Sequence, residues 1–185
     1  MNSLKGQLLV AMPQMTDPRF ARSVVYVCLH NEDEGAMGIV VNKLVASVTM
    51  DELLSHLKLE PTRSNAPRPV HFGGPVDPGR GFVLHSADYH DDGTLVVGEE
   101  FAITSTLDIL RAIGKGQGPR RNFLALGYAG WMPGQLDAEM QANGWLCVDA
   151  DSELVFDDQI DSKWQRALAK LGVDLSMLST DSGHA

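Results

Sequence analysis

The chain has 185 residues, of which 44% are hydrophobic, and its formal net charge at pH 7 is -9. A chain of this length can bury one substantial core, so we expect a single domain over residues 1–178 and a flexible tail over residues 179–185. The acidic balance disfavours direct binding to nucleic acid, because phosphate backbones need clustered Lys and Arg, and the densest basic groups here are pairs such as Arg120–Arg121.

The sequence shows no targeting or metal-binding pattern. The amino-terminal apolar run is short and broken at Pro13, which argues against a signal peptide, and no later run approaches the ~20 residues of a membrane span. Cys28 and Cys147 lie in apolar runs without zinc-ligand spacing. We therefore expect reduced thiols in a cytoplasmic protein without membrane association, metal or cofactor, although the sequence leaves a disulfide between the two cysteines open.

The first third of the chain predicts strands. Residues 6–12 are apolar without a helical period and read as a buried strand. Residues 23–30, with the sequence SVVYVCLH, are apolar on both alternating faces, as in a central strand. The turn sequence NEDEG and the apolar residues 36–42 follow, which predicts a hairpin.

The first predicted helix follows Thr49. Glu52 stands three residues after Thr49 and completes a capping box, so a helix over residues 50–59 is expected. Leu53, Leu54 and Leu57 would form its apolar stripe.

The middle of the chain predicts short strands and a second helix. Residues 69–87 contain two strands joined by a Gly/Pro turn, and Asp92–Gly93 is a turn before a further strand. Ser105, with Asp108 three residues later, predicts the start of the helix, and Gly114 or Gly116 its end. The expected core stripe of this helix is Leu107, Leu110 and Ile113.

The last part predicts a strand at residues 122–131, a short helix after Pro133 that ends at Asn143–Gly144, and a strand at residues 144–150. Asp161 is expected to cap a final helix whose inward residues are Trp164, Leu168 and Leu171. Helices thus alternate with strands without a strict βαβ rhythm, which favours an α+β fold with a mixed, mainly antiparallel sheet.

A cysteine and a histidine stand where the second strand ends. Cys28 and His30 are two residues apart, so they would share one face of a straight strand, and an imidazole could activate the thiol. Cys28 lies inside VVYVCL, however, which is typical of an inert core cysteine. We favour packing for Cys28 and regard the polar strand-end residues His30, Asn31 and Asn42 as better candidates for a binding role.

Several acidic and glycine-rich clusters can be explained without a binding or catalytic site. The carboxylates at residues 32–34 fit a solvated hairpin tip, and the group from His85 to Asp92 fits an acidic surface rather than a metal site. Gly73 and Gly74 suggest a turn with positive φ. Gly127, Gly130 and Gly134 lead from a strand into a helix and could admit a ligand or only allow tight packing around Trp131.

Five ordered segments resemble the AlgH/YqgE family of bacterial proteins: DPRFARSVVYVCLHNEDEGAMGIVVNK, HFGGPV, RGFVLH, LGYAGWMPGQLDAEM and NGWL. The resemblance implies a cytoplasmic α+β domain in which a branched sheet wraps into a pseudo-barrel with peripheral helices. The family has been labelled a transcriptional regulator because of a link to alginate production. No agreed biochemical activity exists for the family, so the resemblance implies none here. The recurring family residues match here at Asp17, Phe20, His30, Asn31, Gly35, Gly38, Asn42, Gly73, Gly74, Pro75, Gly127, Gly130, Trp131, Gly134, Gln135 and Trp145.

The chain departs from the family pattern at two positions. Leu29 stands where the family often has an acidic residue, and Met132 stands where a small residue is usual. If a site needs that carboxylate, it is weakened here.

We therefore expect a non-enzymatic binding or regulatory protein with a protein or small-molecule partner. The alternatives are a thiol-dependent enzyme using Cys28 and His30, and a transcriptional regulator that contacts DNA. The expected binding surface comprises His30, Asn31, Asn42, Gly73, Gly74, Pro75, Gly127, Gly130, Trp131, Gly134 and Gln135.

Overall fold

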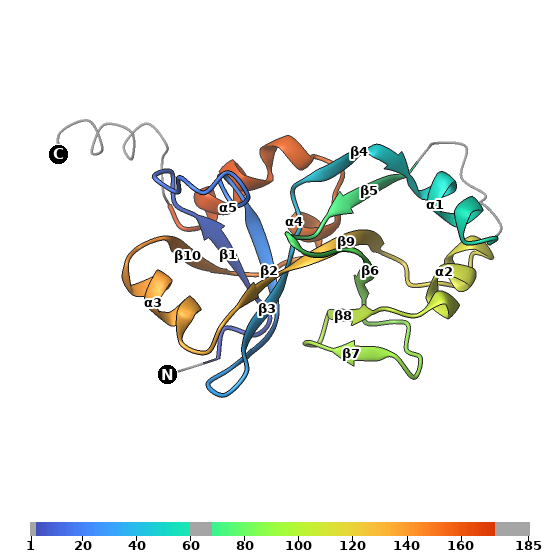
Figure 1. Ribbon diagram of the computed structural model, residues 1–185, viewed down its shortest axis with the longest axis horizontal. Coiled ribbons are helices and arrows are strands. Elements are labelled where there is room, and N and C mark those ends of the chain that lie inside the picture. The colour runs from blue at the N-terminus through green and yellow to red at the C-terminus, as the bar shows by residue number, and fades with distance from the viewer. Residues whose placement is uncertain (1–2, 60–67, 173–185) are drawn as a thin grey trace.

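The structure is a computed structural model that describes residues 3–59 and 68–172 (Figure 1). The predicted tail at residues 179–185 lies outside these ranges. In chain order the elements are β1 (Gln7–Ala11), β2 (Val24–Asn31), β3 (Gly35–Val40), β4 (Leu44–Thr49), α1 (Met50–His56), β5 (Pro69–Phe72), β6 (Val76–Ser86), β7 (Thr94–Val96), β8 (Phe101–Thr104), α2 (Leu107–Gly114), β9 (Asn122–Trp131), α3 (Gln135–Gln141), β10 (Trp145–Asp149), α4 (Ser152–Phe156), a 3-10 turn (Ile160–Ser162) and α5 (Lys163–Lys170).

The described strands form one branched sheet that curls into a half-barrel, with the helices outside it (Figure 1). The main path runs β10-β1-β2-β3-β9-β6-β8-β7, and β4 and β5 form the branch. All pairs are antiparallel except β5 with β9. The α+β fold with a mixed, mainly antiparallel sheet is therefore confirmed.

The long strand β9 is the centre of the branch. β6 pairs along one of its edges, whereas the other edge pairs first with β5, at Ala125–Leu126, and then with β3, at Ala129–Trp131. The end of β9 thus meets the β2–β3 hairpin, and this junction positions the candidate site described below.

Three apolar clusters fill the fold. The largest packs one face of β1, β2 and β3 and parts of β6, β8 and β9 against α4 and α5. The second lies on the opposite face of β1–β3, under α3, and the third lies under α1 and α2. Because β2 has a core on both faces, its sequence is continuously apolar, as the sequence analysis expected.

The N-caps of two helices differ from those predicted from the sequence. The capping box of Thr49 and Glu52 is confirmed, since each side chain accepts a hydrogen bond from the other's backbone N–H. The N-cap of α2, however, is Thr106 rather than Ser105. α5 follows a 3-10 turn whose Asp161 makes no capping hydrogen bond, so the predicted cap there is wrong.

The apolar stripes predicted for the helices were only partly correct. Leu107 is 46% exposed and Ile109 takes its place in the core, because the helix begins at Leu107 and turns this first residue outward. Leu57 and Leu171 follow the ends of α1 and α5 and are also exposed. No prediction was made for β4, β8 or α4, and no helix in the described ranges is long and apolar enough to cross a bilayer.

Candidate functional site

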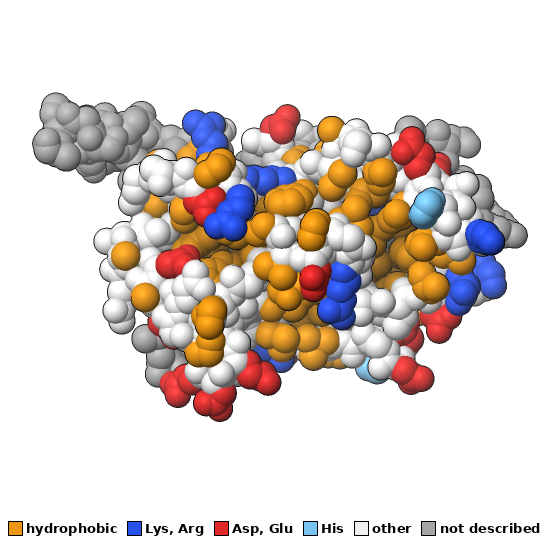
Figure 2. All heavy atoms as spheres, in the orientation of Figure 1, with side chains coloured by type: hydrophobic (Ala, Val, Ile, Leu, Met, Phe, Trp, Pro, Cys, Tyr) orange, Lys and Arg blue, Asp and Glu red, His pale blue; other side chains and the backbone are white. Residues whose placement is uncertain are grey.

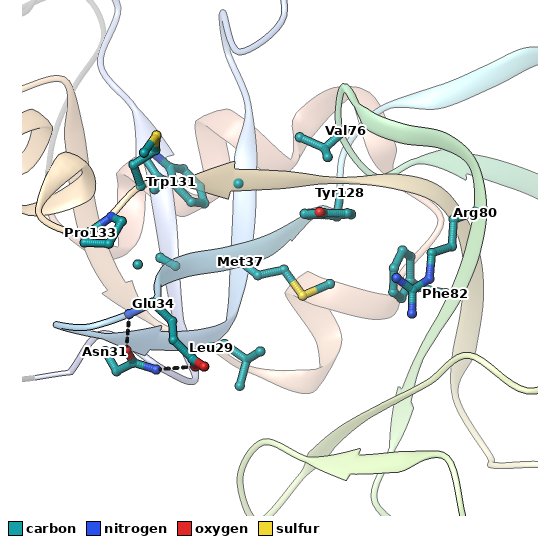
Figure 3. Close-up of a pocket in the computed structure, with 14 residues that line it drawn as sticks. Leu29, Asn31, Glu34, Met37, Val76, Arg80, Phe82, Tyr128, Trp131 and Pro133 are labelled. Atoms are coloured by element: carbon teal, nitrogen blue, oxygen red, sulfur yellow. Dashed lines mark hydrogen bonds between the residues drawn. The ribbon is translucent and has the colours of Figure 1, made fainter.

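A cavity of about 570 Å³ opens between the β2–β3 hairpin, β6 and the end of β9. It continues from the edge of the largest core cluster. Phe82 belongs to that cluster, Met37 and Tyr128 pack against it, and these three residues form the floor of the cavity. Figure 3 shows Asn31 and Glu34 at one end, and Phe82 and Arg80 at the other. The site is therefore an elongated, mainly apolar hollow with charged side chains at its two ends and the Tyr128 ring between them.

Exposed apolar side chains surround this cavity. Leu29, Val76 and Met132 are large hydrophobic residues that remain exposed, and all three line it. Figure 2 shows hydrophobic side chains gathered across the centre of this face, whereas acidic side chains gather at the lower end of the molecule. Leu29 and Met132 are also the two residues expected from the sequence to depart from the family pattern, and both place apolar side chains on the cavity wall.

A β-bulge in β2 decides which residues face the cavity. Val27 pairs with Gly38 and Leu29 pairs with Met37, so Cys28 is the extra residue. The side-chain alternation therefore shifts by one position after Cys28. Leu29 joins Met37 beside the cavity, and His30 turns to the opposite face, where it meets Asp137 of α3.

Cys28 and His30 consequently do not share a face, and that expectation is wrong. Cys28 is fully buried in the largest core cluster, and burial raises the pKa of its thiol to about 12. A thiol in this environment stays protonated at neutral pH and is a poor nucleophile. Cys28 and Cys147 are both free thiols, so the disulfide left open by the sequence is not formed.

His30 holds the amino-terminal segment and α3 together. Its Nδ1 accepts a hydrogen bond of 2.8 Å from the backbone N–H of Leu4, and its Nε2 lies 3.4 Å from Asp137 Oδ1. Because Nδ1 is the acceptor, the proton of the neutral ring is on Nε2 and faces the carboxylate. These contacts support the hairpin from behind, away from the cavity.

The two predicted asparagines order backbone turns. Asn31 accepts hydrogen bonds from the N–H groups of Asp33 and Glu34 and donates to the Glu34 side chain at 3.1 Å, which fixes the hairpin tip at one end of the cavity. Asn42 accepts from Val24 N and donates to Arg22 O. Asn31 lines the cavity and Asn42 does not.

Three of the predicted glycines mark the branch point of the sheet. Gly73 accepts a hydrogen bond from Val40 and donates to Leu126, so its backbone lies between β3 and β9. A Cβ on Gly73 would overlap the Gly127 carbonyl, one on Gly74 would overlap Tyr128, and one on Gly127 would overlap the Gly74 carbonyl. Their role in this structure is to let the strands cross closely, and they lie outside the cavity.

Gly130 and Trp131, by contrast, line the cavity. A side chain on Gly130 would point towards Tyr128 and Val76 at ordinary contact distances of 3.5 and 3.6 Å, so this glycine leaves the hollow open. Gly134 is the N-cap of α3 at φ 79°, and a Cβ added there would meet open space, so the left-handed backbone is what favours glycine at this position.

The side chain of Gln135 secures the turn from β9 into α3. It accepts a hydrogen bond from Met132 N and donates one to Glu139 at 2.9 Å. Glu139 also accepts from the indole N–H groups of Trp131 and Trp145, at 3.2 and 2.9 Å. This carboxylate joins α3 to the ends of β9 and β10.

A second hollow, of about 420 Å³, lies on the other side of Gly130. Pro75 and Gln135 line it together with Phe20, whose ring packs against Trp131 and Trp145. Of the predicted surface, Asn31 lines the first cavity, Pro75 and Gln135 line the second, and Gly130 and Trp131 line both. The predicted set is therefore divided, and its role in binding stays a prediction.

Five residues of the cavity lining were not predicted from the sequence, namely Met37, Val76, Arg80, Phe82 and Tyr128. Tyr128 could have been found, because it lies two residues before Gly130 and so shares its face of β9. Arg80 gave no such signal, since the pairing of β6 with β9 is irregular between Val76 and Gly81.

The fold and cavity define an α+β protein with a half-barrel sheet and one elongated apolar hollow at the β3–β9 junction. The chain belongs to the AlgH-like family DUF179, whose family model matches residues 8–176. It is 54% identical to a UPF0301 protein of Methylocella silvestris, over 98% of this chain and 92% of the relative, and 50% identical to one of Rhodospirillum rubrum, over 98% and 94%.

Two solved structures resemble the chain. The solution structure of the AlgH protein from Pseudomonas aeruginosa is 42% identical, covers 100% of this chain and 97% of its own, and superposes with a TM-score of 0.80. An X-ray structure of a protein from Corynebacterium diphtheriae shares 20% identity over 97% and 92% of the two chains, with a TM-score of 0.75, and shows the fold alone.

Proposed function

We propose that this protein is a non-enzymatic binding protein, and that its site is the cavity between the β2–β3 hairpin, β6 and β9. It takes either a small molecule or a side chain of a protein partner. The observation that carries the proposal is a hollow of about 570 Å³ with a mainly apolar floor and charged side chains at its two ends. Ligand pockets in proteins are typically about 300–1,000 Å³ and have this composition.

The exposed apolar rim supports the same proposal. Leu29, Val76 and Met132 remain in contact with water around the cavity, and Met132 is 72% exposed. Contiguous exposed apolar patches are rare on soluble monomeric domains, and where they occur they often mark a binding site.

Neither alternative has comparable support. The thiol chemistry would need Cys28 and His30 together, and the bulge places them on opposite faces of β2. Contact with DNA would need an uncompensated basic surface. Arg68, Arg120 and Arg121 line a hollow together with Asp157 and Asp158, so its wall carries mixed charge, and Asp157 is itself paired with Arg166.

The proposal includes action as one domain in the bacterial cytoplasm. The two free thiols support that location, because disulfides are rare there.

The test is occupancy of the cavity in solution. Methionines carrying ¹³C-labelled methyl groups report on it directly, because Met37 and Met132 line the cavity and Met50 belongs to the separate cluster under α1. A library of small apolar fragments is expected to shift the Met37 methyl signal, and to leave that of Met50 unchanged.

The matched variants are Gly130→Leu and Gly98→Leu. A leucine at Gly130 would project between Tyr128 and Val76 and fill the hollow, whereas Gly98 has open space around it. Loss of the Met37 shifts in the first variant alone supports the proposal. Fragments that bind both variants and wild type equally would show that the cavity is not the site.

A further inference from the structure

Arg80 is the basic side chain in the wall of the cavity, and its charge has no partner in the described part of the chain. It stands on an exposed stretch of β6, and none of the ion pairs or side-chain hydrogen bonds of residues 3–59 and 68–172 involves its guanidinium. Asp77 is the nearest acidic residue along the strand, and it is neither paired with Arg80 nor part of the cavity wall. The charge of Arg80 is therefore available to a ligand.

The aromatic floor orients this guanidinium. The Arg80 Cζ lies 4.9 Å from the centre of the Phe82 ring, and Phe82 contacts Tyr128 edge-on at 5.8 Å between ring centres. A guanidinium with one face on an aromatic ring is weakly hydrated there and keeps its N–H edge free, and this edge matches a carboxylate in geometry. A group bound to that edge would have its apolar body directly over Tyr128 and Met37.

The opposite end of the cavity carries the opposite charge. Glu34 lies there, held by its hydrogen bond from Asn31, and Figure 3 shows it apart from Arg80 with Met37 and Tyr128 between them. A negative group is repelled at the Glu34 end and attracted at the Arg80 end. The two ends thus impose one direction on an elongated, singly charged ligand.

We propose that the cavity selects organic carboxylates with an apolar body. The carboxylate pairs with Arg80, and the body lies over Tyr128 and Met37 and extends towards Trp131. This inference rests on the proposed binding function and adds the chemical class of the ligand.

The experiment compares three probes of one shape: 4-phenylbutyrate, its neutral amide and 4-phenylbutylamine. Binding to the folded protein is followed through the Met37 methyl signal at low ionic strength. The carboxylate is expected to bind about tenfold more tightly than the amide, because a charge-assisted hydrogen bond is roughly twice as strong as a neutral one. The amine is expected to bind more weakly than the carboxylate, because Glu34, which would attract it at the other end, already accepts a hydrogen bond from Asn31.

Arg80→Gln should abolish the difference between carboxylate and amide. Arg120→Gln removes the same charge from an exposed arginine outside the cavity, beside the hollow formed with Asp157, and is expected to preserve the difference. The advantage of the carboxylate should also fall with added salt, as the attraction is screened.

The possible results distinguish failure of the carboxylate preference from failure of the proposed binding function. Equal binding of carboxylate and amide, an unchanged preference in Arg80→Gln, or tightest binding of the amine would overturn the carboxylate class while the cavity remains a binding site. If no probe and no apolar fragment shifts Met37, the proposed function fails together with the inference.

Discussion

His71 on β5 offers a quantitative test of how this core is built. Its ring is buried and stacks on Phe123, with 3.9 Å between ring centres. Desolvation is the main cause that lowers its pKa, from an ordinary value of 6.5 to about 3, and the nearby positive charges of Lys163 and Arg68 add to it. The folded protein therefore keeps His71 neutral in a pH range where the unfolded chain binds a proton.

The sign and size of the effect follow from this difference. Between pH 6.5 and 3 the unfolded state binds more protons at His71, so the free energy of unfolding falls as the pH falls through this window. Between pH 7 and pH 4.5 the loss from this residue alone is about 2.5 kcal/mol, since one pKa unit corresponds to about 1.4 kcal/mol.

The assay is urea unfolding of wild type and of His71→Phe at pH 7 and pH 4.5. Phenylalanine keeps the stack on Phe123 and cannot be protonated, whereas contributions from carboxylates such as Asp157 are common to both proteins. The variant is expected to lose about 2.5 kcal/mol less than wild type between the two pH values. Equal losses, within about 0.5 kcal/mol, would refute the assignment of a buried neutral imidazole.

Three further substitutions or reactions test other parts of the structure. Gly74→Ala is expected to lower the free energy of unfolding by more than about 3 kcal/mol, because its Cβ would overlap the Tyr128 backbone. Gly98→Ala, in open space, should change it by less than about 0.5 kcal/mol, and a tolerated alanine at Gly74 would contradict the close strand crossing. Iodoacetamide at neutral pH should modify Cys147 before Cys28, because Cys28 is fully buried and the pKa of its thiol is raised; mass spectrometry measures the order. Rapid labelling of Cys28 in the folded protein would support the thiol-dependent enzyme instead. Glu139→Ala is expected to lower the free energy of unfolding by about 3 kcal/mol, because two indole N–H groups lose their acceptor, and to alter the tryptophan fluorescence. Gln135→Ala, at an exposed position, should lower it by less than about 1 kcal/mol. Equal effects of the two substitutions would be evidence against a central role for Glu139.

The sequence predicted the elements whose local signals are strong. The continuous apolar run of β2, the capping box of Thr49 and Glu52, and the long strand β9 all appear as expected. The family resemblance supplied the branched, curled sheet, which no local pattern could show. The start of α2 was misplaced by one residue because Ser105 and Thr106 are both good caps, and Thr106 is also fixed by its hydrogen bond to Asp91.

The candidate site was harder to predict, because two irregularities decide it. The bulge at Cys28 reverses the faces of Leu29 and His30, and the irregular pairing of β6 brings Arg80 to the cavity. Neither has a sequence signal, since both depend on the partner strand. Gly73, Gly74 and Gly127 drew attention as glycines, but only the structure shows that they serve the crossing of β3, β5 and β9.

The most direct test of the central claim is a crystal structure of the protein grown with 4-phenylbutyrate. The phenyl ring is expected over Tyr128 and Met37, with the carboxylate at Arg80. A probe bound instead in the hollow between Arg68, Arg120 and Arg121, with the cavity beside Tyr128 empty, would contradict it.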